Sequence, residues 1–498
     1  MANEMLFAAY PSAIVYELGT DPTGQPPQKL TAKKHLLWGD VLVVAGKSHD
    51  GNFFRVKVRG VEGWIRAEET QPNRLLEIVF VDIGQGDGAL VVTPDDKRYV
   101  IDAGQGDNMF RFLRWRFGFK EKVSFDAAIM SHSDEDHYGG FEYLFADPNV
   151  YFQTVYSNGL MERAADSTTE TLSKPMVFGG RKYIADLVTD LSELQAFLSN
   201  PANWTKKKYP GMLSKALNAG KFGDFRMLDL NEGHLSGHGP GESLTIEVLG
   251  PFVEKVDSKR ALRWLGDVGK TKNGHSVVFR FKMKNVNIFM GGDLNIESSR
   301  MLLEAHTGLS PNPKSAEEEA TLVEAARPIF GSDIAKACHH GSADTLLPFM
   351  KAINPVATVI SSGDDEPHAH PRADALGAIA KCSRGERPLL LSTELARSTK
   401  ETIKHPVVLR AQLSELAAKI AAASDEKKRA AAQKKFDGLV AKLDRSVAVY
   451  GAINLRTDGE KVVMAYKLEQ STPVKGWDIY KLEPAGSSGR LIYKSKYD

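Results

Sequence analysis

The chain has 498 residues, of which 42% are hydrophobic, and its charged residues nearly cancel to a net charge of +1. A chain of this length exceeds one ordinary core, so we expect two or three domains that fold without cross-links. The near-zero net charge excludes a global field that attracts nucleic acid, so contact with a polyanion depends on local clusters of cations. Two cysteines, Cys338 and Cys382, cannot form a disulfide framework, and no run of ~20 apolar residues predicts a membrane span. We therefore expect a cytoplasmic protein with no membrane contact.

Residues 1–72 predict a small β domain. Its β-rich runs, separated by turn residues, are 41–44, 53–58 and 64–65. The segment resembles a bacterial SH3-like barrel, which implies a domain that binds a peptide or positions another domain. Trp38, Phe53 and Trp64 are the candidates for a peptide-binding groove. The alternative is that these aromatic side chains fill the barrel core, which we favour for Trp64.

From residue 75 the pattern changes to short strands bounded by turns, which is typical of a sandwich core. These strands are expected at 76–83, 89–93 and 99–101. The glycine-rich connection 84–88 lacks the Lys-Ser/Thr of a phosphate-binding loop, so it does not predict a nucleotide site.

The densest group of possible metal ligands follows the apolar run 125–130 and ends in a Gly-Gly turn. It contains His132, Asp134, Glu135, Asp136 and His137. Imidazole and carboxylate are the usual ligands of catalytic zinc and its neighbours, and such sites keep a position open for water. A polar surface loop that happens to be acidic is the alternative interpretation, and later segments weigh against it.

Three later segments supply further candidates. The strand 286–290 ends in Gly-Gly-Asp293, and an Asp beside a metal site can bridge two cations because its carboxylate has two oxygens. Adjacent histidines on a strand point to opposite faces, so after the strand at 334–336 we choose His340 as the ligand. His339 would then support the ligands or contact the leaving group. His370 follows the next strand, 356–361, and His368 is expected at the rim.

These motifs, in this order, resemble the metallo-β-lactamase fold and, more narrowly, the hydrolase domain of the competence protein ComEC. The residues that carry the resemblance are 81–87 (Val-Asp-Ile-Gly-Gln-Gly-Asp), 101–104 (Ile-Asp-Ala-Gly), 131–140 and the His-His-Gly-Ser run 339–342, within about 76–376. The fold commonly has His-x-His-x-Asp-His, whereas this chain has Asp134 at the second ligand position, as is usual in the ComEC-like branch. In many enzymes of this fold a histidine ligand lies near 273–275, so whether His275 ligates stays open.

The resemblance implies an α/β protein with an αββα sandwich over 73–498 and two divalent ions, zinc or manganese. One ion would take His132, Asp134 and His340, the other Asp136, His137 and His370, with Asp293 as the bridge. Beside the metal ligands, Asp136 is assigned a catalytic role, and Lys336, Ser342 and His339 would hold a phosphate.

The remaining segments are expected to support this domain. Residues 145–229 are predicted to form an insert, with a helix near 187–198, that makes a lid or a substrate wall. Residues 409–443 are rich in Ala, Leu, Lys and Glu and predict a helical hairpin insert at about 405–445. A final hairpin at 447–468 is expected to complete the main sheets.

The leading functional hypothesis is a metal-dependent hydrolase of phosphodiesters, with DNA and RNA among the candidate substrates. Two cations ~4 Å apart lower the pKa of a shared water and stabilise the attacking and leaving oxygens, so hydrolysis needs no protein nucleophile. Hydrolysis of a small ester, lactone or thioester is the first alternative, because one fold hosts many substrates. A non-enzymatic, metal-stabilised protein that recruits partners through its β domain and helical hairpin is the second.

Overall fold

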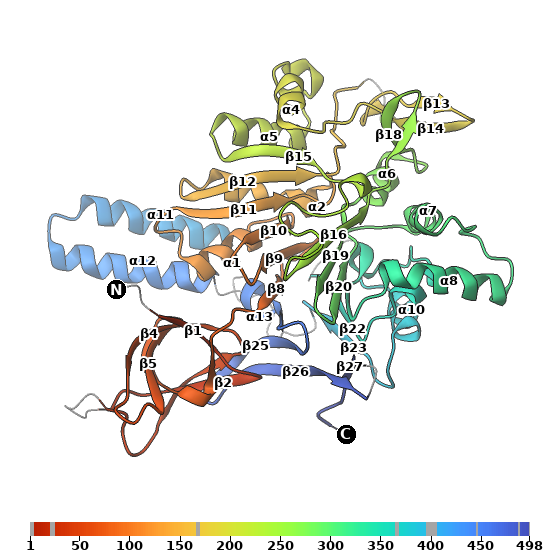
Figure 1. Ribbon diagram of the computed structural model, residues 1–498. Coiled ribbons are helices and arrows are strands. Elements are labelled where there is room, and N and C mark those ends of the chain that lie inside the picture. The colour runs from red at the N-terminus through yellow and green to blue at the C-terminus, as the bar shows by residue number, and fades with distance from the viewer. Residues whose placement is uncertain are drawn as a thin grey trace.

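The computed structural model describes residues 4–19, 25–165, 170–363, 368–394, 406–444, 447–486 and 489–497. It shows a mixed α/β protein in which a ten-stranded and a six-stranded sheet, flanked by helices, form the centre, and a seven-stranded and a four-stranded sheet lie beside them (Figure 1). No helix in these ranges is long and apolar enough to cross a membrane.

A ten-stranded sheet provides one half of the central core. Its strands in spatial order are β15 (Phe222–Met227), β12 (Val150–Ser157), β11 (Val123–Ile129), β10 (Arg98–Ala103), β9 (Gly88–Val92), β8 (Leu76–Phe80), β24 (Ile453–Thr457), β25 (Val462–Thr472), β26 (Lys475–Ala485) and β27 (Arg490–Tyr493). Because β10, β11, β12 and β15 run parallel, their carboxyl ends meet at one edge of the sheet. β24 pairs with β8, so the C-terminal strands complete the main sheet as predicted.

A six-stranded sheet provides the other half. Its order is β16 (Thr245–Gly250), β19 (Val278–Met283), β20 (Val286–Met290), β21 (Ile334–Lys336), β22 (Ala357–Ile360) and β23 (Leu389–Ser392). The last four strands are parallel, so their carboxyl ends also share an edge.

The two sheets pack face to face, with helices on both outer faces. Alternate residues of β8 show this, since Ile78 faces the core between the sheets and Val79 faces the helices. The ten-stranded sheet is covered by α1 (Asn108–Phe117), α3 (Phe141–Ala146), α4 (Leu191–Leu198), α5 (Lys208–Asn218) and α13 (Val447–Tyr450). The six-stranded sheet is covered by α7 (Ile296–Thr307), α8 (Ala316–Phe330), α9 (Leu347–Ile353) and α10 (Ala373–Cys382). The result is four layers, helix, sheet, sheet and helix.

The segment 145–229, predicted to be an insert, is largely part of the central architecture, so that prediction is wrong in its main point. It contains β12 and β15, which extend the ten-stranded sheet, and α4 and α5, which cover it. Leu194 and Leu198 of α4 are buried against the sheet, whereas Leu187 precedes the helix. A separate small sheet is made of β13 (Met176–Phe178), β14 (Arg181–Ile184), β18 (Lys259–Arg263) and β17 (Glu254–Val256).

The N-terminal segment forms a seven-stranded sheet with a core of its own. Its order is β3 (Ala32–Leu37), β2 (Ser12–Tyr16), β6 (Val61–Arg66), β5 (Phe53–Val58), β4 (Val41–Lys47), β1 (Met5–Ala8) and β7 (Thr70–Gln71). The predicted boundary after residue 72 falls between β7 and β8 and, like the SH3-like assignment, stays a prediction.

The predicted aromatic groove is wrong for Trp38, whereas the burial of Trp64 agrees with the core position favoured for it. Trp38 and Trp64 are each 2% exposed, and Phe53 is half-buried. Trp38 packs against Val463 and Trp477 of the C-terminal strands, so it joins the seven-stranded sheet to the ten-stranded one.

Buried charges reinforce this junction. Arg456 of β24 donates to the carbonyl of Trp38 at 2.8 Å, to Asp40 at 3.0 Å and to Glu77 at 3.1 Å. Arg59 forms a two-bond pair with Asp40, and Arg116 pairs with Glu77 at 3.0 Å.

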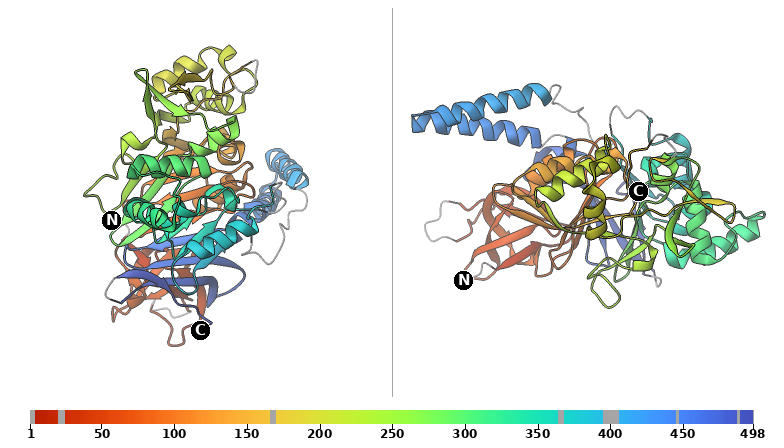
Figure 2. Two further views of the ribbon diagram at one scale, coloured as in Figure 1. Left: turned by 90° about the vertical axis from the view of Figure 1, so that its right-hand side faces the viewer. Right: turned by 90° about the horizontal axis from the view of Figure 1, so that it is seen from above.

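Helices α11 (Pro406–Ala422) and α12 (Glu426–Asp444) occupy the stretch predicted to be a helical hairpin and project from the body (Figure 2). Residues 405 and 445, the predicted limits of this insert, lie outside the described residues.

Candidate metal centre

The candidate ligands gather where the carboxyl ends of parallel strands from both large sheets meet. His132 follows β11, and His137 lies on α2 (Glu135–Tyr138), one turn further on. Asp293 follows β20, and His340 follows β21. An asparagine cap, Asn295, begins α7 two residues after Asp293 and fixes the direction of the chain there.

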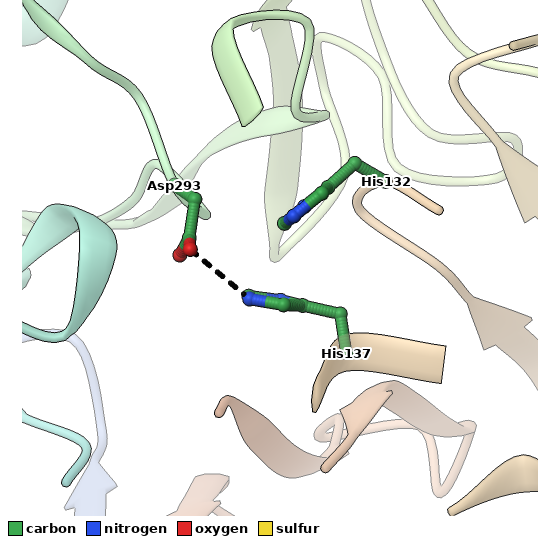
Figure 3. A group of neighbouring side chains, drawn as sticks. All are labelled: His132, His137 and Asp293. Carbon is green, nitrogen blue, oxygen red and sulfur yellow. Dashed lines mark ion pairs between the residues drawn. The ribbon is translucent and has the colours of Figure 1, made fainter. Parts of the chain in front are cut away.

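One carboxylate oxygen lies at the centre of the cluster. Asp293 Oδ2 is 3.2 Å from His137 Nε2, 3.2 Å from His340 Nε2 and 3.9 Å from His339 Nε2. Figure 3 shows His132, His137 and Asp293 pointing toward one another. The ring centroids of the two histidines are 4.0 Å apart. Asp136 completes this side, since its Oδ2 is 3.7 Å from His340 Nε2.

Asp102 orients His137 from behind. Its Oδ2 lies 2.9 Å from His137 Nδ1 and also accepts from the Ser131 hydroxyl, while its Oδ1 accepts from the Ser131 amide, each at 2.7 Å. A carboxylate at Nδ1 favours the tautomer that carries its proton there, which leaves the Nε2 lone pair free to bind a metal.

Asp87 lies beside His340 Nδ1, as Asp102 lies beside His137 Nδ1. Its Oδ1 lies 3.1 Å from His340 Nδ1, and its other oxygen pairs with the buried ammonium of Lys336. Lys336 also lies 4.0 Å from Asp293 Oδ1, so it supplies positive charge beneath the carboxylates. Sequence reasoning assigned Lys336 to substrate phosphate; the structure gives it protein partners below the cluster.

Gly86 lets the Asp87 loop reach the metal loop. Its φ is +100°, and a Cβ at this position would stand 1.7 Å from the carbonyl oxygen of Asp136. Only glycine combines this backbone conformation with so close an approach.

Asp134 has a different environment from the other acids. It pairs with the buried ammonium of Lys272, which is held in turn by Glu162 at 3.0 Å and the Ser133 carbonyl at 3.2 Å. The Asn273 side-chain amide lies 2.7 Å from it. His132 Nε2 is 3.6 Å from Asp134, so this carboxylate borders the cluster while its charge is matched by a lysine.

The predicted division of ligands between two ions is not the one that the geometry shows. Among the described residues, the groups whose ligand atoms lie within 4.8 Å of one another are His132, His137 and Asp293; Asp136, His137 and His340; Asp87, Asp293 and His340; and Asp87, Asp102 and His137. Asp134 and His370 belong to none of these groups, and His132 and His340 are in different ones.

The two adjacent histidines do not lie on a strand, so the prediction that they point to opposite faces is wrong. β21 ends at Lys336, and His339 and His340 form a turn with φ of +49° and +53°. This turn brings both rings toward Asp293, with His340 buried and a quarter of the His339 side chain exposed. His370 stacks on His340 with ring centroids 6.2 Å apart, and His368 stacks on His370 at 5.8 Å, nearer the rim.

The remaining candidates lie outside the cluster. The Ser342 hydroxyl accepts from the Asp344 amide at 3.2 Å, in the turn that follows the histidines. His275, whose role was open, turns away to the carbonyl of Arg263, to which its Nε2 donates at 2.7 Å. Burial lowers the pKa of His275 to about 4, so it is neutral and structural.

The histidines and carboxylates of the cluster strongly shift one another's pKa values. Burial alone would lower the pKa of His340, but the carboxylates of Asp293 and Asp87 outweigh it and raise that pKa to about 10. Burial alone would raise the pKa of Asp293, but His137 and His340 hold it well below its usual range. The arrangement therefore favours ionised carboxylates beside positive charge.

The donor set fits a divalent cation. In the described part of the chain, the buried atoms His137 Nε2, His340 Nε2 and Asp293 Oδ1 have no hydrogen-bond partner. Buried polar atoms are normally hydrogen-bonded, and the two imidazole nitrogens both lie 3.2 Å from Asp293 Oδ2, so a cation bound beside that oxygen would give both nitrogens a partner.

Sequence reasoning missed Asp87 and Asp102 as parts of the site. Both lie in the motifs that carried the family resemblance, so the signal was present, but nothing in the spacing of those motifs shows which histidine each carboxylate contacts.

No family model and no curated protein matches this chain. Among solved structures, it is similar to a mutant of the CmlA beta-hydroxylase, with 11% identity and a TM-score of 0.30 over 66% of this chain and 54% of that one. It is also similar to a protein of unknown function from Enterococcus faecalis V583, with 14% identity and a TM-score of 0.23 over 67% and 73%. Both likenesses are remote, and this chain spans about half the length of the first.

Proposed function

We propose that this chain is a metal-dependent hydrolase of phosphodiesters, built on a metallo-β-lactamase-type sandwich. The observation that carries the proposal is the convergence of His137, His339 and His340 on Asp293 Oδ2. Within the described residues, the buried Nε2 atoms of His137 and His340 have no hydrogen-bond partner. The four-layer order of helices and sheets and the order of the motifs support the choice of fold.

His132, His137, His340, Asp136 and Asp293 would hold one or two divalent cations. Bound there, such ions would supply a water of lowered pKa and positive charge for the oxygens of the transition state. Zinc and manganese both suit a set of imidazole and carboxylate ligands.

The protein's own groups would position this chemistry. Asp102 and Asp87 fix the orientation of His137 and His340, and Lys336 balances the charge of the buried acids. His339 is the histidine of the turn that stays partly exposed, and burial lowers its pKa, so it presents a neutral ring to a bound substrate. Its place beside Asp293 suits a contact with the leaving group.

Phosphodiesters are chosen as the substrate class because of the motifs that resemble the ComEC-like hydrolases. The testing experiment measures cleavage of single-stranded DNA, double-stranded DNA, RNA, bis-p-nitrophenyl phosphate and a panel of lactones and thioesters by the full chain. Each substrate is tested with manganese, zinc or a chelator, beside the Asp293→Ala variant and a matched control, Glu135→Ala. Glu135 is adjacent to Asp136 but points outward to Lys208, at 2.8 Å, with 42% of its side chain exposed.

We expect metal-dependent cleavage of a phosphodiester that disappears with Asp293→Ala and persists with Glu135→Ala. If the chain cleaves only lactones or thioesters, the proposed substrate class is wrong, and the proposed metal site stands. A metal-loaded protein that cleaves nothing would favour the binding-protein alternative, and full activity of Asp293→Ala would contradict the proposed centre.

A further inference from the structure

A polar cavity lies at the end of the six-stranded sheet opposite the candidate metal centre. It has a volume of about 420 Å³ and is lined by residues of β19, the end of α8 and β27, and by residues at the start of β20, before β21 and between α10 and β23. Because β20 to β23 are parallel, these positions mark the amino ends of the strands, whereas the metal centre lies at their carboxyl ends. In Figure 1, α2 marks the metal end above the sheet and β27 lies below.

The two sites are too far apart to share one small ligand. The five residues of β20 separate Asn285, at the cavity, from Asp293, at the metal centre. At ~3.3 Å per residue, this strand places roughly 17 Å between the two ends. The cavity is therefore a separate site.

Cations dominate the lining. Among the described residues around the cavity, five are cationic and one, Asp333, is acidic. The cations are Arg280, Lys282, Arg327, Arg384 and Arg490. They come from β19, α8, the α10–β23 connection and β27, so segments distant in sequence bring like charges together.

Two carboxylates pair with three of these cations. Arg280 and Lys282 share a single carboxylate, Glu247, at 2.6 and 3.3 Å, and Arg384 pairs with Asp333. Arg327 donates to the carbonyl of Lys351 at 3.0 Å. Like charges that remain close in this way are stabilised by an anion between them.

Arg384 is held as a preformed donor. Its Nη1 donates to the carbonyls of Ser332 and Asn354 at 3.1 and 2.6 Å, which fixes the guanidinium in place. Its Nε is buried and, within the described ranges, has no hydrogen-bond partner. Burial lowers the pKa of Arg384; Asp333 opposes this, and the charge of Arg490 lowers the pKa further.

The chemistry of the lining favours phosphate groups over bases or apolar groups. None of the described lining residues is aromatic, so a base finds no ring to stack on, and Asn285 and Asn287 add polar amides. Arginine presents a planar set of donors that matches phosphate oxygens. A volume of about 420 Å³ lies within the range of small-molecule sites.

We propose that this cavity binds an oligophosphate anion, either free tripolyphosphate or the phosphate chain of a nucleotide. The site is independent of the metal centre and of the hydrolase activity proposed for it.

The test is isothermal titration calorimetry of the full, chelator-treated chain with tripolyphosphate and with ATP. The chelator removes divalent ions that would hold phosphates at the other site. The test variant is Lys282→Gln/Arg327→Gln/Arg490→Gln, which removes three charges from side chains that are at least partly exposed and leaves Arg384 and Arg280 in place. The control, Lys427→Gln/Lys428→Gln/Arg429→Gln, removes the same charge from the exposed start of α12.

We expect tripolyphosphate and ATP to bind the unmodified chain with similar affinity. Both should bind the test variant at least about tenfold more weakly, and the control variant with the affinity of the unmodified chain. Thermal unfolding of all three proteins checks that the substitutions leave the fold intact. Absence of binding, equal weakening in the two variants, or binding of ATP without tripolyphosphate would overturn the proposal. Binding of a single-stranded oligonucleotide that needs the cavity cations, with no binding of tripolyphosphate, would assign the cavity to nucleic acid instead.

Discussion

The buried carboxylates at the junction with the N-terminal sheet and those at the candidate metal centre differ in how their oxygens are matched, although Arg456 Nε at the junction is buried with no hydrogen-bond partner among the described residues. At the junction, Asp40 Oδ1 accepts from Arg59 at 2.7 Å and from Arg456 at 3.0 Å, and Glu77 accepts from Arg456 and Arg116. At the metal centre, the described atoms Asp293 Oδ1 and His137 Nε2 are buried without a hydrogen bond. Matched atoms indicate a structural cluster, and converging unmatched atoms indicate a ligand.

The direction of the pKa shift does not separate the two clusters. Burial would raise the pKa of Asp40, but Arg59 and Arg456 hold it well below its usual range, and the histidines do the same for Asp293. The two clusters differ instead in the groups that pair with the carboxylates. Guanidinium groups make permanent ion pairs, whereas imidazoles can also bind a metal.

The largest effect is expected from a substitution that breaks the ion pairs at the junction. Arg456→Met should lower the free energy of unfolding by about 3–5 kcal/mol, because Asp40 and Glu77 would remain buried without a shared cation. Urea unfolding measures the loss. Arg55→Met on β5, which removes a pair with Glu62 that is 43% and 31% exposed, is the control and should change stability little. Metal affinity should be the same in both variants, and a weaker metal site in Arg456→Met would contradict the separation of the two clusters.

A second substitution tests the carboxylate behind His137. In Asp102→Asn, the amide group would donate toward Nδ1 and move the ring proton to Nε2, which faces the cluster. We expect metal affinity to fall by about 10- to 100-fold, measured by competition with a chelating dye. Asp126→Asn is the matched control on β11, where the carboxylate accepts from the Arg98 amide at 2.8 Å, away from the histidines. Equal affinity in the two variants would show that Asp102 does not orient the ligand.

The dependence of stability on pH, compared between the unmodified chain and Arg456→Met, tests the contribution of the acids at the junction. Asp40 and Glu77 have folded-state pKa values below their unfolded values. Their contribution to stability is therefore complete above pH ~4.5 and is lost as the pH falls, by about 1.4 kcal/mol per pH unit for each carboxylate. Thermal unfolding between pH 7 and pH 3 measures the slope. Arg456→Met should show a shallower slope, and an unchanged slope would assign the acid sensitivity elsewhere.

The smallest effect concerns an exposed ion pair. Lys215 and Glu142 are 3.3 Å apart, with side chains 77% and 61% exposed. Lys215→Ala should change the free energy of unfolding by less than about 1 kcal/mol, because water already solvates both charges. Urea unfolding beside Arg456→Met shows whether burial sets the scale of the effect, and a loss as large as that of Arg456→Met would contradict this.

Local patterns in the sequence carry much of the candidate site. His132, His137 and Asp293 lie where short strands end, and strand ends can be predicted from apolar runs and glycine pairs. The structure brings these three residues together.

Contacts between distant segments, and rare backbone conformations, could not be predicted in this way. Asp87 meets Lys336, which lies 249 residues later in the chain, and no local pattern encodes that contact. His339 and His340 adopt positive φ, which non-glycine residues seldom do, so a strand was the natural expectation. β12 and β15 are neighbours in one sheet. They were missed because both are short and flank a long polar segment, whose composition favoured an insert.

The place of β24 between β8 and β25 has a consequence for the order in which the chain can be assembled. β8 emerges during synthesis almost 380 residues before Arg456, the partner that matches Glu77. Until then, one long edge of the growing sheet and the Trp38 face of the seven-stranded sheet both lack their final cover. A chain cut at residue 72, or ended before β24, would expose unpaired strand edges and unmatched acids, so neither fragment is a sound choice for expression.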